Sequence, residues 1–515
     1  MFVRKKKNRS GSTSVVIVNK DSGKSQYVKT IGISSDAQEI NELCRQGKEY
    51  IHAMGGQMDL FGSYEQQARE EELTDAFLSN IENVLLNGTQ LILERLYKRI
   101  GFDKVDDDIL KKLVIARLSQ PLSKAATVDY LKSHFAEDIH LVKIYRYLDK
   151  LNDTQKEIIQ QISVEHTRKV LGGQIGLVFY DVTTLYFESD YGDELRETGF
   201  SKDGKHAQPQ IVLGLLVSRD GYPLAYSLFN GSQYEGYTMI PVVEDFVNRF
   251  RLDDFVVVAD SGLMNKTNLL LLESGGHKYI IGARIKNETE DIKGLILSLE
   301  KQDGQFYEIQ KSDNCRLIIS YSEKRAKKDF HNREKGVKRL FKDFGKGKVT
   351  KENINKRGYN KFLELTDDVG VRISKDKIAD DTKWDGLKGY LTNTDLLAKD
   401  VYEQYTGLWV IERAYRVTKG TLDLRPVFHF TPRRIEAHIC ICFIAYKVYK
   451  ELERVLRINQ INISADKCLN IAKTITTIKI KMPLHNRTKS KTLILTDQHK
   501  KIAKLFTDEF WLNQR

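Results

Sequence analysis

The sequence predicts an α/β protein in which a mixed β-sheet with flanking helices is interrupted by a β-containing insertion. Three observations support this fold class. Residues 173–282 alternate strand-length apolar runs with amphipathic helical segments, residues 283–395 hold strand-like pieces around a basic stretch, and residues 73–172 carry apolar residues at helical spacing. Such an order is typical of a sheet that has helices on its faces.

The length of 515 residues predicts several domains, because a single hydrophobic core rarely grows so large. We expect six regions: residues 1–72 with a short β-hairpin and a helix, 73–172 mostly helical, 173–282 the first part of the core, 283–395 the insertion, 396–456 the second part of the core, and 457–515 the C-terminal region.

The hairpin is expected from two β-rich runs, residues 14–18 and 26–31, with turn-forming residues between them. A helix over residues 36–52 and a polar linker over 55–72 should follow.

The mostly helical region is expected because apolar residues such as Ile81, Val84, Leu85 and Leu91 recur at helical spacing. Two short segments, residues 124–134 and 141–151, are joined by a turn. Such a pair fits either a helix-turn-helix module or two neighbouring helices of a bundle, and the sequence leaves both open.

The core should begin with three strands and continue with alternating helices and strands, in the order β-β-β-α-β-α-β. We expect the strands at residues 177–180, 211–217, 222–229, 255–258 and 278–281, and the helices at 239–250 and 265–273. In its second part, residues 408–419 read as a helix. Another helix should start at Thr431-Pro432, because Thr is a good N-cap and Pro fits the first helical position.

Positive charge is concentrated in the insertion. The chain has 82 Lys and Arg against 70 Asp and Glu, a net charge of +12. Residues 324–361 alone hold fifteen Lys or Arg against four Asp or Glu, interleaved with Phe330, Phe341, Phe344 and Tyr359. This pattern fits either a solvated surface segment or a face that binds a polyanion such as nucleic acid.

Several protein classes are excluded by what the sequence lacks. It has no apolar run of 18 residues and no apolar segment behind the basic start, so we expect neither a membrane span nor a secretory signal. The five cysteines are odd in number and scattered, which favours a reducing compartment over a disulfide framework. We therefore expect a cytoplasmic protein.

Three carboxylates stand out as candidate metal ligands. Asp181 and Asp260 each follow an apolar strand, and the carboxyl edge of an open α/β sheet is where such folds place their sites. Glu412 shares a helix face with Arg416 and Lys419, so that face offers one oxygen ligand and two phosphate-binding cations. Taken singly, however, each Asp also fits a turn former, and Glu412 with Arg416 a surface ion pair.

Three motifs carry a resemblance to a known family. They are Tyr180-Asp-Val-Thr-Thr-Leu-Tyr186, Val258-Ala-Asp-Ser-Gly262, and Tyr405-Thr-Gly-Leu-Trp-Val-Ile-Glu-Arg-Ala-Tyr-Arg-Val-Thr-Lys419. In this order they resemble the DDE transposases of bacterial insertion sequences, in the group with a Tyr-Arg-Glu-Lys signature. The resemblance implies a ribonuclease H-like core that is split by an insertion domain, and it covers roughly residues 176–449.

The resemblance assigns roles to individual residues. Asp181, Asp260 and Glu412 match the three catalytic, metal-binding carboxylates. Tyr405 and Lys419 match signature residues that contact DNA near the cleaved end. The signature Arg should stand at position 408, where this chain has Leu408, and we expect Arg413 or Arg416 to take over its phosphate contact.

The function implied is a DNA transposase that cuts and joins the ends of its own mobile element. It would use two Mg²⁺ ions, with Mn²⁺ able to substitute. Its partners would be double-stranded DNA, namely the terminal inverted repeats and the target, and a second copy of the chain, with residues 73–172 serving DNA binding or dimerisation. It would associate with the nucleoid when bound to DNA. The alternatives are a ribonuclease H-like nuclease without strand transfer and a catalytically silent DNA-binding protein.

Overall fold

The computed structural model describes residues 1–21, 23–55, 60–189, 191–201, 204–252, 254–263, 265–355, 358–366, 370–425, 427–482 and 487–512. The chain folds as two compact units, which are considered separately. The first comprises Met1–Val84 and Ile478–Lys491, and the second comprises Leu85–Thr477 and Thr492–Arg515.

The first unit begins with a three-stranded antiparallel sheet, ordered β1-β2-β3, on which helix α1 (Ala37–Gly55) packs. The expected hairpin is present as β2 (Thr13–Asp21) and β3 (Lys24–Ser34), and β1 (Phe2–Lys7) adds a strand that the basic N-terminus did not suggest. The linker expected over residues 55–72 is wrong from residue 60 onward. Helix α2 (Leu60–Ser79) lies there, because its many Glu, Gln and Ala residues are strong helix formers.

Residues 81–85 were expected to be helical and form strand β4 (Ile81–Leu85) instead. This strand pairs in a small sheet ordered β16-β15-β4, with β15 (Thr476–Met482) and β16 (Arg487–Leu493). Ile81, Val84 and Leu85 match helical spacing by themselves. The deciding interaction is pairing with a strand about 400 positions away in the sequence, which local periodicity does not reveal.

A helical bundle forms one side of the second unit. Its central helix is α15 (Pro432–Ile458), which begins at the expected proline and contacts α3, α4 and α6. Its other helices are α3 (Gly88–Ile100), α4 (Asp108–Ser119), α5 (Lys124–Phe135), α6 (Leu141–Thr154), α7 (Lys156–Val170), α16 (Ala465–Ala472), α17 (Asp497–Ile502) and α18 (Asp508–Leu512). All five cysteines are free.

The core sheet has the predicted order of strands and helices. The strands are β5 (Leu177–Tyr186), β6 (Gln210–Ser218), β7 (Pro223–Asn230), β8 (Val256–Ala259) and β9 (Lys278–Ala283), with helices α8 (Met239–Phe250) and α9 (Lys266–Ser274). Strands β5, β6 and β7 pair antiparallel, while β8 lies parallel to both β5 and β9. This topology confirms the predicted mixed sheet with flanking helices.

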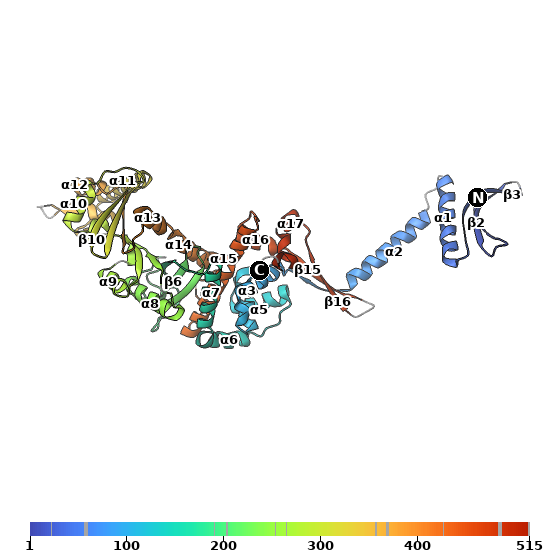
Figure 1. Ribbon diagram of the computed structural model, residues 1–515, viewed down its shortest axis with the longest axis horizontal. Helices are drawn as coiled ribbons and strands as arrows, with labels where there is room; N and C mark the ends of the chain where they lie inside the picture. Colours follow the sequence, from blue (N-terminus) through green and yellow to red (C-terminus); the bar gives the residue numbers. More distant parts are fainter. Residues whose placement is uncertain are drawn as a thin grey trace. The chain divides into compact units, whose positions relative to one another are not determined.

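Three strands of the insertion extend the core sheet, whereas two short ones pair only with each other. The eight-stranded sheet has the order β10-β11-β14-β9-β8-β5-β6-β7. The insertion contributes β10 (Phe306–Ser312), β11 (Cys315–Tyr321) and β14 (Leu387–Thr392), together with α10 (Glu290–Ser298), α11 (Glu323–Gly345), β12 (Leu363–Leu365), β13 (Val371–Ile373) and α12 (Lys375–Thr382). Most of the basic stretch is thus one long helix, α11 (Figure 1).

The two faces of the sheet are covered by different helices, which Figure 1 labels. Alternate residues of β5 enter two cores. Phe179 and Leu185 pack in the core that includes α13 (Ala398–Thr406), α14 (Trp409–Arg416) and α15, whereas Val178 and Val182 pack in the core that includes α8 and α9. The helix containing the third candidate carboxylate therefore covers one definite face. No helix among the described residues is long and apolar enough to cross a membrane.

Candidate active site

Asp181 lies on β5, and Asp260 directly follows the neighbouring parallel strand β8. The register pairs Tyr180 of β5 with Ala259 of β8, so the next residue of each chain segment is one of the two aspartates. Asp181 lies inside β5 and not after it, because β5 runs on to Tyr186 while β8 ends at Ala259. The site therefore forms where β8 ends, so that the following residues of β5 have no strand partner among the described residues on the β8 side.

Helix α14 lies across β5 at this point. The hydroxyl of Tyr415 donates to the carbonyl oxygen of Asp181 over 2.7 Å, and Lys419 Nζ donates to the carbonyl oxygen of Thr184 over 3.0 Å. Glu412 is exposed and precedes Tyr415 by three residues, about one helical turn. Side-chain alternation directs Asp181 to the face of Phe179, which is the face that α14 covers.

The expected helix over residues 408–419 is shorter and is followed by an irregular turn. Helix α14 ends at Arg416, and Val417–Thr421 form a π-helical turn that includes Lys419. π-helical turns are frequent at functional sites, because they shift the residues that follow relative to the regular helix. At the other end, Gly407 separates α13 from α14, and an ideal Cβ on Gly407 would lie only 2.6 Å from Phe179 Cζ. Glycine thus permits the close approach of this helix pair to β5.

Tyr405 is buried beside Asp260 and does not form an exposed surface for DNA. Its side chain is 3% exposed, and its hydroxyl donates to Asp260 Oδ1 over 2.8 Å. Burial, and then the Asp260 carboxylate, raise the pKa of Tyr405, so the hydroxyl stays protonated and able to donate. Gly282 makes room for it, since an ideal Cβ there would lie 2.4 Å from the Tyr405 hydroxyl oxygen.

Lys388 brings a positive charge from the insertion to the same place. It lies on β14, and its Nζ is 4.4 Å from the centroid of the Tyr405 ring. Burial and nearby Arg325 lower the pKa of Lys388, while the carboxylates of Asp260 and Glu412 act in the opposite direction. Lys388 therefore interacts electrostatically with two of the three candidate carboxylates. Sequence reasoning missed it, although a lone lysine in an apolar strand is the available signal.

The three carboxylates do not form a ready-made metal cage. Within the described ranges, no group of three or more His, Cys, Asp or Glu side chains is arranged to hold a metal ion. The donor set nevertheless suits a hard divalent cation, because all three candidates offer carboxylate oxygens. Asp260 and Glu412 are exposed, and Asp181 is half-buried.

The remaining predicted DNA contacts are separated by the structure. Lys419 lies against β5, near Asp181. Arg416 is exposed on α14. Arg413 instead forms an ion pair with Glu453 of α15, so its guanidinium is directed away from the carboxylates. Leu408, at the position of the signature Arg, is half-buried against the core.

A cavity of about 510 Å³ opens next to this site on the insertion side. Ser261, Tyr405 and Lys388 connect it to the carboxylate site. Its other charged lining residues are five cations and three carboxylates, namely Arg284, Lys286, Arg325, Arg333, Lys361, Asp329, Asp381 and Asp385. The insertion and the core together therefore form a cationic recess beside Asp260.

Comparisons with known proteins agree with the motifs. The family described as "Transposase DDE domain" matches residues 172–447, more than half of the chain. Among solved structures, the chain is similar to a piggyBac transposase synaptic complex with hairpin DNA, with 9% identity over 85% of this chain and 80% of that one, at a TM-score of 0.37. A Mos1 transposase paired-end complex with the left transposon end gives 9% identity over 34% and 58%, at a TM-score of 0.16. No curated protein matches this chain.

Proposed function

Because this chain belongs to the family of transposases with a DDE domain and is a DNA transposase, we propose that it cuts and joins DNA strands at Asp181, Asp260 and Glu412. The observation that carries this proposal is the register of β5 and β8, which makes the two aspartates neighbours beneath the helix of Glu412. The ends joined would be those of its own mobile element.

The three carboxylates would hold two Mg²⁺ ions, for which Mn²⁺ can substitute. When bound, the ions would supply activation of the attacking oxygen and stabilisation of the leaving oxygen in phosphodiester displacement. Tyr405 would hold Asp260 in one orientation by its hydrogen bond, as partners of a ligating carboxylate commonly do. Glu412 is exposed and would move toward the aspartates only when the site is loaded.

Cationic side chains around the carboxylates would hold the scissile phosphate. Lys419, in the π-helical turn, lies against β5, Arg416 is exposed at the end of α14, and Lys388 approaches from β14. Phosphate oxygens accept charge-assisted hydrogen bonds from such groups. The signature Tyr would thus act on Asp260 and not on DNA, and Lys388 would be one of the groups that replace the missing signature Arg.

The basic insertion would bind the DNA flanking the cleaved end. Helix α11 holds nine Lys or Arg against four Asp or Glu, and Phe330, Phe341 and Phe344 are exposed on it. Double-stranded DNA would be the partner, and affinity should fall steeply with salt, because each neutralised phosphate releases counterions. Two ends must be brought together for joining, so the active assembly would contain at least two copies of the chain.

The test is cleavage and joining of a duplex carrying the element's end, with Asp260→Asn as the key variant. We expect cleavage to fall at least about 100-fold while DNA affinity is retained, because the variant removes a ligand charge and little volume. Asp254→Asn is the matched control, since Asp254 pairs with Lys278 at the opposite end of the parallel strands. Loss of folding in Asp260→Asn, or unchanged cleavage, would contradict the assignment.

A pre-cut end with a free 3′-hydroxyl separates the remaining alternatives. A transposase yields joined products from it, a nuclease without strand transfer yields none, and a catalytically silent DNA-binding protein neither cuts nor joins. No observation on the described residues favours either alternative, and the family match favours the transposase.

The role of Lys388 is tested separately. Lys388→Met should lower the cleavage rate about 10-fold with little change in DNA affinity, because a single cation near the reacting phosphate is lost. Lys388→Arg should recover part of the rate, since the charge is kept. Equal rates for Lys388→Met and the unmodified protein would show that this lysine only supports the packing of Tyr405.

A further inference from the structure

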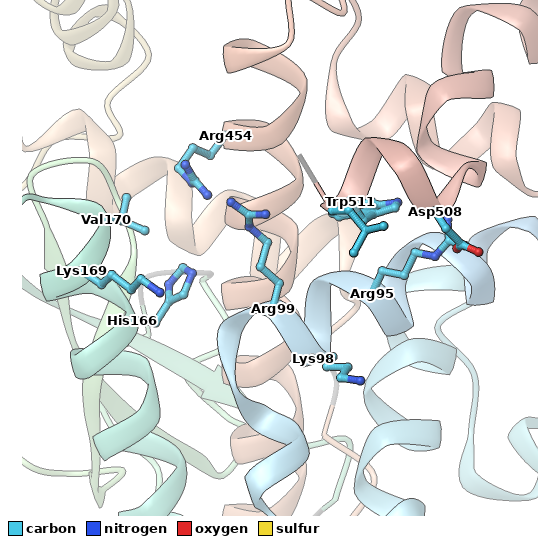
Figure 2. Close-up of a pocket in the computed structure, with 10 residues that line it drawn as sticks. Arg95, Lys98, Arg99, His166, Lys169, Val170, Arg454, Asp508 and Trp511 are labelled. Atoms are coloured by element: carbon cyan, nitrogen blue, oxygen red, sulfur yellow. The ribbon is translucent and has the colours of Figure 1, made fainter. Parts of the chain in front are cut away.

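A second cationic pocket lies in the helical side of the second unit, and none of the three candidate carboxylates lines it. Its volume is about 820 Å³. Five cations line it, drawn from three helices: Arg95, Lys98 and Arg99 of α3, Lys169 of α7, and Arg454 of α15 (Figure 2). His166, Asp508 and Trp511 complete the polar and aromatic part of the wall.

The sequence spacing explains why these side chains share one pocket. Positions 95, 98 and 99 are related by three and four residues, and so lie on one face of α3. His166 and Lys169 are three residues apart on α7. Helix α15 contacts both α3 and α7 and brings Arg454, and the guanidinium groups of Arg99 and Arg454 approach each other in Figure 2.

The carboxylate of Glu451 bridges Arg99 and Arg454 by accepting a hydrogen bond from each. It is 0% exposed, and its carboxylate accepts from Arg99 Nε at 3.0 Å and from Arg454 Nη2 at 2.6 Å. Tyr222 donates to its other oxygen at 3.0 Å. One carboxylate therefore serves two guanidinium groups, each of which has five N–H donors. On the described residues, Arg99 makes a single side-chain hydrogen bond.

The other cations of the pocket are compensated less. Lys98 and Lys169 are exposed and form no ion pair with any residue that the structure describes. Arg95 pairs with Asp508, whose side chain is 88% exposed, so that pair is weak. Five cations thus face two carboxylates. An anion with several acceptor oxygens would relieve the repulsion that remains.

We propose that this pocket binds backbone phosphates of the DNA at a distance from the scissile bond. The inference rests on the proposed function for the identity of the ligand, because DNA is the polyanion that a transposase handles. Lys98 and Lys169 would contact phosphate oxygens at the rim, and Arg99 and Arg454 deeper in the pocket. Trp511, whose Nε1 donates to the carbonyl of Leu505 over 2.9 Å, gives an apolar wall suited to a deoxyribose.

The experiment measures duplex DNA affinity of the full chain as a function of salt, using Lys98→Ala/Lys169→Ala. Both lysines are exposed, and neither contacts Glu451 in the described interactions. Replacing them should therefore leave the hydrogen bonds of Glu451 and the folding of the chain unaffected. We expect binding about 10-fold weaker, and a slope of log affinity against log salt that is smaller by about 1.8, which is two released counterions. Lys278→Ala is the control, because Lys278 is exposed and lies outside the pocket.

Free phosphate and a nucleotide distinguish the sources of the phosphate group. Inorganic phosphate and a deoxynucleoside monophosphate are titrated into the unmodified protein and the double variant. Competition with DNA that disappears in the variant supports the proposal. If the small ligands bind in a lysine-dependent way while DNA affinity and salt slope stay unchanged in the variant, the pocket is a nucleotide site and the proposal is wrong. Unchanged binding of all three ligands also overturns it.

Failure of this inference is separable from failure of the proposed function. The Asp260→Asn variant is assayed for cleavage and the pocket variant for binding, and the two residue sets do not overlap. If Asp260→Asn abolishes cleavage while the pocket variant binds DNA normally, only the pocket assignment fails. If Asp260→Asn cleaves normally, the catalytic proposal fails whatever the pocket variant does.

Discussion

Two groups of side chains in the second unit differ in how the charge of their carboxylates is compensated. Around Glu451, one fully buried carboxylate is surrounded by Arg99, Arg454 and the Tyr222 hydroxyl. Around Asp260, two of the three carboxylates are exposed, and Asp260 accepts a hydrogen bond from the neutral hydroxyl of Tyr405. A buried charge must be compensated within the fold, whereas an exposed acidic group keeps its ligand capacity. The buried Glu451 carboxylate therefore has a structural role, and the exposed carboxylates around Asp260 remain available for chemistry.

The largest expected effect is on the stability of the folded chain, when the buried carboxylate of Glu451 is removed. Glu451→Gln leaves Arg99 and Arg454 without their shared carboxylate, so we expect the free energy of unfolding to fall by about 3–5 kcal/mol. Denaturant unfolding of the full chain measures it. A change below about 0.5 kcal/mol would erase the distinction between the two groups.

The stability difference between the unmodified protein and Glu451→Gln should depend on pH if it is electrostatic in origin. Burial opposes ionisation of Glu451, but the hydrogen-bonded guanidinium of Arg454 and the nearby His166 ring outweigh it and hold the pKa of Glu451 well below the ordinary value of 4.5. A depressed folded pKa gives stability that is present above the unfolded value and is lost on acidification. The stability gap between the unmodified protein and Glu451→Gln should therefore shrink by about 1.4 kcal/mol for each pH unit below 4.5.

A smaller effect is expected at the carboxylate site, and on activity alone. Tyr405→Phe removes the hydrogen bond to Asp260 and keeps the ring that packs beneath Lys388. We expect a roughly 10-fold loss of cleavage, in the range for partners of metal ligands, with stability nearly unchanged. A raised Mg²⁺ requirement would support orientation of Asp260 as the cause. Weaker DNA binding at an unchanged Mg²⁺ requirement would instead support the contact with DNA that the family resemblance implies.

Tertiary pairing explains where sequence reasoning went wrong. Ile81, Val84 and Leu85 satisfy helical spacing, yet they form β4, because a partner strand near residue 480 is available. The polar residues 60–72 were expected to form a linker, but they belong to helix α2, because many of them are strong helix formers. In the insertion, the strand-like pieces were visible. The structure shows that β10, β11 and β14 extend the core sheet through the pairing of β14 with β9, and that β12 and β13 pair separately; both facts follow only from long-range contacts.

The sequence by itself determined the order of strands and helices in the core, the positions of Asp181 and Asp260 beside apolar runs, and the family. These follow from local periodicity and from motifs that are contiguous in the chain. Only the tertiary structure decided that β8 ends beside Asp181, that Tyr405 turns inward to Asp260, and that Lys388 and the Glu451 network meet residues far away in sequence. The reason is physical: burial, pairing register and charge compensation depend on neighbours that are distant along the chain.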